Sequence, residues 1–244
     1  MYKCNTWLYK RDVKLVLLGT LYTISTPIGN LSDISFRSIE VLKKIDYLIC
    51  EDTRVTRKLL NHYNIKINLL SYNVFNENKL TEKYVKYLTD GKDMGLVSDA
   101  GTPCISDPGY KLVNKCRQMN IEVISIPGPS SLTSALSVSG LPSDSFYFEG
   151  FLPKKKGRKT KFEFLSSMPS TIVIFESPYR LVKTVEDIFD YMGNRQICIC
   201  KELTKVYERV MFGNVLNILE LLKDEVKLKG EYVIIIAKEG YLLK

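Results

Sequence analysis

The segment LYTISTPIGN, residues 21–30, decides the fold class. Its first half, residues 21–25, has the β-branched and aromatic content of a strand, and its second half places Pro27 and Gly29 in a loop directly after it. Apolar residues at helical spacing follow over 34–45, so we expect a helix there, capped by Ser32 or Asp33. A strand, a Gly/Pro loop and a helix in this order form the repeating unit of a parallel α/β sheet.

The same alternation continues along the chain. It predicts further strands at 47–50, 69–71, 94–97 and 122–126, and helices at 55–63, 79–89, 110–119 and 131–139. Beyond a Gly/Pro break at 140–144, strands are expected at 146–150, 171–176, 196–201, 207–212 and 232–237, with helices at 159–166, 180–191 and 215–222. We therefore predict two α/β domains, a mostly parallel one over 19–141 and a mixed one over 142–244, preceded by an N-terminal extension at 1–18.

Composition limits the chemistry. The chain has 244 residues, 45% of them hydrophobic and 25% charged, as in ordinary globular proteins. His62 is the single histidine, so a His-rich zinc site is excluded. The six cysteines are scattered without a Cys-x-x-Cys pair, which favours free thiols in a reducing cytoplasm over a metal site. No apolar run approaches the roughly 18 residues of a membrane span, so a cytoplasmic protein is expected.

The formal net charge of +8 is concentrated in two short segments. One is the extension at 1–18. The other is the basic segment, residues 154–161, whose cations stand without an acid among them: Lys154, Lys155, Lys156, Arg158, Lys159 and Lys161. A run of this kind is either a solvated loop or a surface that neutralises nucleic-acid phosphates.

Gly, Pro, Asp and Ser follow the first, fourth and fifth predicted strands, at 26–30, 98–109 and 127–131. Loops after the carboxyl ends of parallel strands share one edge of the sheet, where ligands bind. Each loop alone is equally explained as a tight turn. Neither a Gly-x-Gly-x-x-Gly dinucleotide motif nor a P-loop occurs, so the predicted ligand edge is not a common nucleotide cradle.

A charged cluster, Glu51-Asp52-Thr53-Arg54, ends the second strand, with Arg57 one helical turn later. Carboxylates and guanidinium groups this close should pair with one another or meet a ligand. Thr53 is also a plausible N-cap for the helix that follows. Polar clusters at 175–180 and 201–205 end two strands of the second half. Helix capping and ordinary surface exposure can explain these clusters as well as a ligand site can.

Taken in order, these motifs resemble the tetrapyrrole (corrin/porphyrin) methylase superfamily, and within it the small-subunit ribosomal RNA (cytidine-2′-O)-methyltransferases. The resemblance covers roughly residues 19–240. It rests on the segments 26–33, 51–54, 98–103, 105–109, 127–130, 139–142, 150–153, 176–177, 202–205 with Glu208, and 230–231.

The resemblance implies a homodimer that binds S-adenosylmethionine in a cleft between its two α/β domains. It implies methylation of the ribose 2′-hydroxyl of a cytidine in 16S (small-subunit) rRNA, free or in the assembled subunit. Matching positions assign the cofactor to Pro27, Asp99, Ala100, Gly101, Ile105, Ser130, Ser131 and Leu203. They assign catalysis to Glu51, Asp52 and Arg54, and RNA binding to Lys154, Lys155, Lys156, Arg158, Lys159 and Lys161. No metal is implied.

For the proton of the hydroxyl, Asp52 and Glu51 are the candidate acceptors, or else they only orient Arg54. Two positions depart from the family pattern: Tyr179 replaces a usual His and Lys201 a usual Arg. The extension at 1–18 has no counterpart. Two alternatives remain at this point: a small-molecule tetrapyrrole-precursor methylase, and a non-catalytic RNA-binding protein.

Overall fold

The computed structural model describes residues 18–223 and 228–241, so nearly all of the predicted extension lies outside the described residues. Contacts divide the chain into two compact units. Unit 1 contains Phe36–Asp99, Asp107–Pro127 and the described residues up to Ile24. Unit 2 contains Ser25–Ser35, Ala100–Ser106 and the described residues from Gly128 onward.

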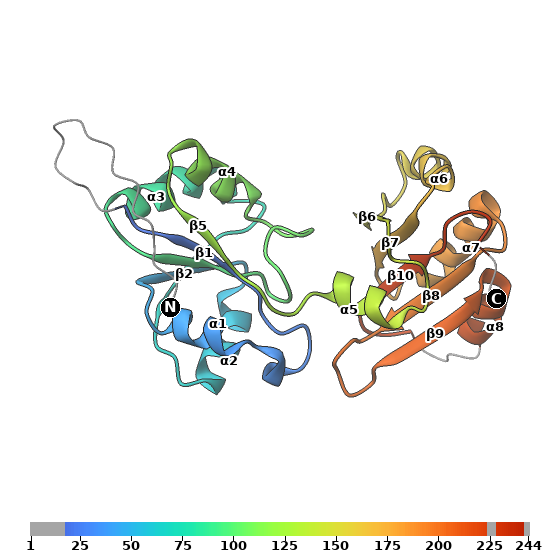
Figure 1. Cartoon of the computed structure of the whole chain (residues 1–244), viewed down its shortest axis with the longest axis horizontal. Helices are drawn as coiled ribbons and strands as arrows, with labels where there is room; N and C mark the ends of the chain where they lie inside the picture. Colours follow the sequence, from blue (N-terminus) through green and yellow to red (C-terminus); the bar gives the residue numbers. More distant parts are fainter. Residues whose placement is uncertain (1–17, 224–227, 242–244) are drawn as a thin grey trace. The chain divides into compact units, whose positions relative to one another are not determined.

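Unit 1 is built on a parallel sheet of five short strands (Figure 1). Its strands are β1 (Leu21–Ile24), β2 (Tyr47–Cys50), β3 (Asn68–Ser71), β4 (Met94–Leu96) and β5 (Val123–Ile126). They lie in the order β3-β2-β4-β1-β5, and every neighbouring pair is parallel. The prediction of a mostly parallel N-terminal sheet is therefore confirmed.

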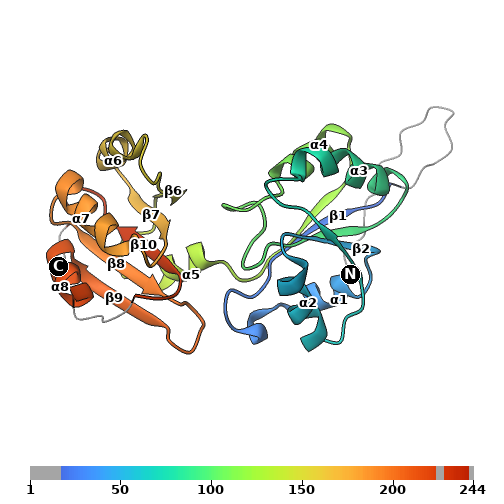
Figure 2. The ribbon, with the colours of Figure 1, turned by 180° about the vertical axis from the view of Figure 1, so that it is seen from behind.

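Helices cover both faces of this sheet. They are α1 (Phe36–Leu42), α2 (Thr53–His62), α3 (Glu77–Thr89) and α4 (Tyr110–Gln118). α3 and α4 lie on one side and α1 and α2 on the other, as Figure 1 and the reverse view in Figure 2 show. Because both faces are covered, side chains of the inner strands are buried on both sides, with Leu21, Ile24 and Ile49 fully inaccessible, whereas the edge strands β3 and β5 are more exposed.

The first helix begins later than predicted. Residues Leu31–Asp33 form a separate 3-10 turn, η1, whose N-cap is Asn30. The backbone then extends at Ile34 (φ −65°, ψ 138°), and α1 starts at Phe36. An extended residue interrupts the helical hydrogen-bond series, so the prediction that Ser32 or Asp33 caps the main helix is wrong.

Unit 2 is built on a mixed five-stranded sheet in the order β6-β7-β10-β8-β9. Its strands are β6 (Phe146–Phe151), β7 (Thr171–Glu176), β8 (Gln196–Lys201), β9 (Arg209–Asn214) and β10 (Tyr232–Ile236). β6 and β7 are parallel, and the other neighbours are antiparallel. This confirms the mixed C-terminal sheet.

Two apolar layers sandwich that sheet. α6 (Arg158–Ser166), α7 (Leu181–Met192) and α8 (Val215–Lys223) contribute to the layer that contains Ile172 and Ile174. Val173, on the opposite face of β7, packs in a second layer with α5 (Ser131–Val138) and with Ile28. Because Ile28 belongs to this core, the loop after β1 groups with unit 2 and not with the sheet that precedes it.

Within the described residues, none of the helices combines the length and apolarity needed to cross a membrane.

Candidate functional site

The predicted catalytic residues Glu51, Asp52 and Arg54 lie in unit 1 just after β2, and the predicted cofactor residue Asp99 follows β4. Glu51 directly follows β2, and Asp99 lies just beyond β4. Since β2 and β4 are neighbouring parallel strands, their ends meet. The backbone N–H of Asp52 donates to Oδ1 of Asp99 at 3.0 Å, which joins the two loops. The structure therefore brings Asp99, a predicted cofactor residue, beside Glu51 and Asp52.

Asp52 is the N-cap of α2. Its Oδ1 accepts a hydrogen bond from the backbone N–H of Arg54 at 2.8 Å, and its Oδ2 lies 2.6 Å from Nη2 of Arg54. Thr53 is the first helical residue, so the prediction that Thr53 caps this helix is wrong: the carboxylate one position earlier already satisfies the free N–H. The side-chain hydrogen bond from Arg54 lowers the pKa of Asp52 to about 2, which makes Asp52 a weak proton acceptor.

The pKa values of three other carboxyl groups near Asp52 are shifted in the opposite direction. Burial, followed by the charge of neighbouring aspartates, raises the pKa of Glu51 above its ordinary value. Burial likewise raises the pKa of Asp99, and that of Asp107 to about 6. Asp107 was not among the predicted site residues. Its place in the Gly/Pro-rich segment after the fourth strand was the available signal.

Three of the predicted cofactor loops are tied together within unit 2. Thr26 and Gly101 exchange two backbone hydrogen bonds, at 2.9 and 3.0 Å. The hydroxyl oxygens of Ser25 and Thr102 lie 3.0 Å apart, and the Thr102 hydroxyl donates to the carbonyl oxygen of Pro129 at 3.2 Å. Pro27, Ala100, Gly101, Ser130 and Ser131 are thereby brought into one group of loops.

Close backbone approach explains the glycines in this group. Gly101 has φ +79°, a left-handed conformation that glycine adopts without steric cost. A Cβ at Gly128 would lie 3.1 Å from the Cβ of Ser25, and one at Gly29 would collide with Lys205. The loop after β1 also reaches the turn between β8 and β9, because the backbone N–H of Asn30 donates to the Thr204 hydroxyl at 3.1 Å.

The predicted cofactor residues differ in what they can offer a ligand. Ser130 precedes α5 but makes no side-chain capping bond to it, so helix capping does not account for its hydroxyl. Ile105 is 41% exposed. The side chain of Leu203 is buried with Ile28 in the second apolar layer, so Leu203 would contact a ligand mainly through its backbone.

The basic segment divides into structural and exposed cations. Arg158 donates to Oδ2 of Asp187 and to the Thr184 hydroxyl, both at 2.8 Å, and to the carbonyl oxygen of Pro153 at 3.1 Å. Lys161 pairs with Glu149 at 2.9 Å. Lys159 reaches Glu163 only at 3.7 Å and is exposed. Lys154, Lys155 and Lys156 are exposed and form no ion pair with any described residue.

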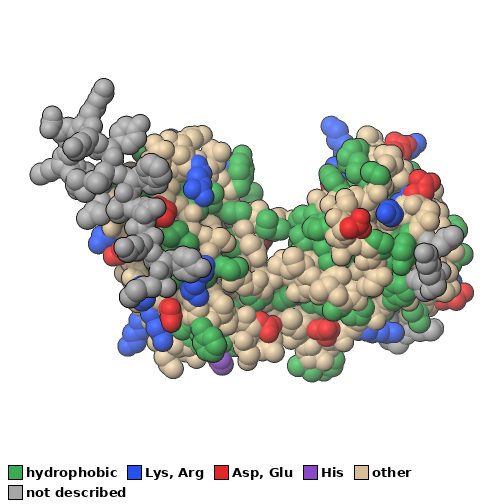
Figure 3. Space-filling model, in the orientation of Figure 1, with side chains coloured by type: hydrophobic (Ala, Val, Ile, Leu, Met, Phe, Trp, Pro, Cys, Tyr) green, Lys and Arg blue, Asp and Glu red, His purple; other side chains and the backbone are tan. Residues whose placement is uncertain are grey.

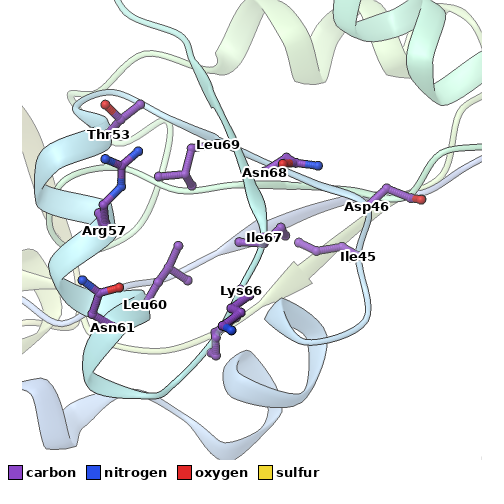
Figure 4. A pocket seen from close by; sticks show the side chains of 11 residues that line it. Ile45, Asp46, Thr53, Arg57, Leu60, Asn61, Lys66, Ile67, Asn68 and Leu69 are labelled. Carbon is purple, nitrogen blue, oxygen red and sulfur yellow. The ribbon is translucent and has the colours of Figure 1, made fainter.

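A separate pocket of about 710 Å³ opens in unit 1 between α2 and the segment leading into β3 (Figure 4). Its polar lining includes Arg57, Asn61 and Lys66, and Leu60 and Ile67 contribute apolar surface. None of the predicted catalytic or cofactor residues lines it.

The protein family to which this chain belongs follows from comparison with known proteins. Residues 20–218 match the family model for Tetrapyrrole (Corrin/Porphyrin) Methylases. The chain belongs to this family, which confirms the resemblance in its motifs. It is similar to "Ribosomal RNA small subunit methyltransferase I" of Thermotoga maritima, with 46% identity over 81% of this chain and 89% of the relative. The protein of the same name from Halalkalibacterium halodurans is 44% identical over 91% of this chain and 77% of the relative.

Solved structures support the same fold. The uroporphyrin-III-C-methyltransferase of Thermus thermophilus superposes with a TM-score of 0.61 and 17% identity, over 90% of this chain and 94% of that chain. The cobalt precorrin-4 methyltransferase CbiF superposes with a TM-score of 0.65 and 14% identity, over 89% and 94% of the two chains. At these identities the likeness establishes the fold alone.

Proposed function

We propose that this chain transfers a methyl group from S-adenosylmethionine to the 2′-hydroxyl of a cytidine ribose in small-subunit ribosomal RNA. The observation that carries the proposal is the 44–46% identity, over 81–91% of this chain, to relatives named for methylating small-subunit ribosomal RNA. The exposed Lys154, Lys155 and Lys156 support a polyanionic substrate. We further propose a homodimer that acts in the cytoplasm, on free rRNA or on the assembled subunit.

The donor set of unit 2 fits S-adenosylmethionine. Gly101 permits close backbone approach, and Ser130 and Ser131 supply hydroxyl groups at the start of α5. Pro27 and Ala100 complete the loops that these residues share. When bound, the cofactor supplies a sulfonium-activated methyl group. The protein must therefore hold the ribose oxygen in line with that methyl and accept the hydroxyl proton.

Within unit 1, Glu51 is the proposed proton acceptor. Arg54 holds Asp52 ionised with a pKa of about 2, so Asp52 takes up a proton poorly near neutral pH. Burial raises the pKa of Glu51, which makes its carboxylate the more basic of the pair. Asp52 and Arg54 then act as positioning residues, because the N-cap fixes the start of α2 next to Glu51.

The test is transfer of labelled methyl groups to small ribosomal subunits and to naked rRNA. We expect Glu51→Gln to lower kcat by about 10²–10⁴-fold, as loss of a general base does, while cofactor affinity stays unchanged. Glu40→Gln, an exposed change in α1, is the matched control and should retain wild-type turnover. Absence of label in both substrates would contradict the proposed function. Unchanged turnover in Glu51→Gln would contradict only the proposed role of Glu51 as proton acceptor, and not the proposed function.

A further inference from the structure

Two aromatic rings are exposed where β6 and β7 end. Tyr179, three residues beyond β7, is 95% exposed, and Phe151, the last residue of β6, is 57% exposed. β6 and β7 are parallel neighbours with Phe151 in register with Phe175, so both rings stand at the same edge of the sheet. The rings of Phe175 and Phe151 pack edge to face, with their centroids 5.7 Å apart, so Phe175 supports the Phe151 ring.

Hydrogen bonds of Arg180 connect the two segments that carry these rings. Arg180, next to Tyr179, donates to the carbonyl oxygen of Leu152, next to Phe151, at 2.9 Å. Arg180 is itself held by Glu176, whose side chain is fully buried, at 2.7 Å. The backbone that bears the two aromatic residues is therefore held by the Arg180 contacts, and the Phe151 ring is supported in addition by Phe175.

The same scaffold presents exposed positive charge. Arg158 donates to the carbonyl oxygen of Pro153, which anchors the start of the loop bearing Lys154, Lys155 and Lys156. Carboxylates of this region are already paired: Glu149 with Lys161, Glu176 with Arg180, and Asp187 with Arg158 and Lys183. The charge of the three lysines is thus left for a partner. Figure 3 shows basic side chains projecting from unit 2 at the end where α6 begins.

We propose that this aromatic–lysine surface (Phe151, Lys154, Lys155, Lys156 and Tyr179) binds single-stranded RNA. Tyr179 and Phe151 stack on unpaired bases while the lysines neutralise phosphates, the combination that unpaired nucleic acid requires. A second copy of this chain, with a formal net charge of +8, is a poorer complement to the three cations than a phosphate backbone. The inference rests on the proposed function and deepens it, because it identifies which residues recognise the RNA.

The stacking part is tested by titrating the full-length protein with a fluorescent single-stranded RNA oligonucleotide, without a methyl donor. Tyr179→Ala should weaken binding by about 5- to 100-fold, the usual effect of losing one stacked base, and Phe151→Ala should act in the same direction. Tyr179→Phe keeps the ring and should bind like the wild type. Phe146→Ala is the matched control: Phe146 begins the strand that Phe151 ends and is 42% exposed.

The charge part is tested by the salt dependence of the same titration. The double variant Lys155→Gln/Lys156→Gln should reduce the slope of log Kd against log salt by about 1.4, because two fewer phosphates of a single strand are neutralised, each worth about 0.7. Tyr179→Ala should leave that slope unchanged, since stacking releases none. Lys43→Gln/Lys44→Gln removes the same charge from exposed positions after α1 and should leave both affinity and slope unchanged.

Equal RNA affinities for Tyr179→Ala and Phe146→Ala would overturn the inference. A change of oligomeric state in Tyr179→Ala with unchanged RNA affinity would overturn it too, since the ring would then contact a second copy. These outcomes are independent of the proposed function. If the wild type methylates rRNA and Tyr179→Ala binds RNA normally, only the proposed stacking surface is contradicted. If RNA binding depends on Tyr179 but no methyl group is transferred, only the proposed reaction is contradicted.

Discussion

The buried carboxylate of Glu176 should be a main determinant of stability. Its oxygens accept hydrogen bonds from the backbone N–H of Ser177 at 2.7 Å and from the Thr184 hydroxyl at 2.6 Å, and Oε1 lies 2.7 Å from Nη2 of Arg180. Glu176→Gln keeps the volume but replaces one acceptor oxygen by a donor NH₂ group. It also leaves the guanidinium of Arg180 without its counter-charge.

The expected loss follows from the burial of the pair. Removing one partner of a buried ion pair costs about 3–5 kcal/mol, because the remaining charge stays desolvated. The side chain of Arg180 retains 22% exposure and a second acceptor at Leu152, so the lower end of that range, about 3 kcal/mol, applies. For a chain of this size, such a loss lowers the unfolding midpoint by about 6–12 °C.

Differential scanning calorimetry measures this loss. The matched control is Glu163→Gln, since Glu163 is 54% exposed and pairs with Lys159 only at 3.7 Å; we expect a shift below about 2 °C. Adding Arg180→Met to Glu176→Gln should recover part of the loss, because no unpaired buried charge then remains. If Glu176→Gln melts within about 2 °C of Glu163→Gln, the reasoning from burial is refuted.

Two further substitutions test the cluster and the loops. The raised pKa of Asp107, about 6, makes the folded state bind its proton more tightly than the unfolded chain, so stability falls as pH rises from about 4 to 6. In urea unfolding, Asp107→Asn should therefore raise the free energy of unfolding by about 1–2 kcal/mol at pH 8, a value reduced for the partial exposure of this side chain, and should leave it unchanged at pH 4. An equal increase at both pH values would contradict this reasoning. Gly101→Ala strains a φ of +79° and should weaken cofactor binding in calorimetric titration, whereas Gly193→Ala, at φ +75° with open space for a Cβ, should cost only stability. Similar cofactor affinities for the two glycine variants would argue against a role for the Gly101 loop.

Local sequence carries most of the secondary structure. The strands at Tyr47–Cys50, Thr171–Glu176 and Gln196–Lys201 have the predicted bounds, because each is a short apolar run between turn residues. β9 begins two residues later than predicted, at Arg209. Positive φ angles at Glu202 and Thr204 prolong the turn before it, a conformation that propensity does not reveal.

Side-chain partners at the site were less predictable than the loops. The basic segment gives six cations equal weight, yet Arg158 finds its partner Asp187 29 residues further along the chain. Asp52 instead of Thr53 caps α2, because either residue type can fill that position and only the backbone angles decide between them. Spacing shows which residues gather at one edge, whereas tertiary contacts decide which charges remain for a ligand.

The exchange of loops between the units has a consequence for dissecting the protein. The described chain passes from one unit to the other five times, after Ile24, Ser35, Asp99, Ser106 and Pro127. No single proteolytic cut or gene truncation can therefore release unit 2 intact. A fragment starting at residue 142 would lack Ile28, Ala135 and Leu136, and would leave the apolar side chains of Val173 and Val233 facing water. Such fragments should aggregate, so the units must be investigated by substitution within the whole chain.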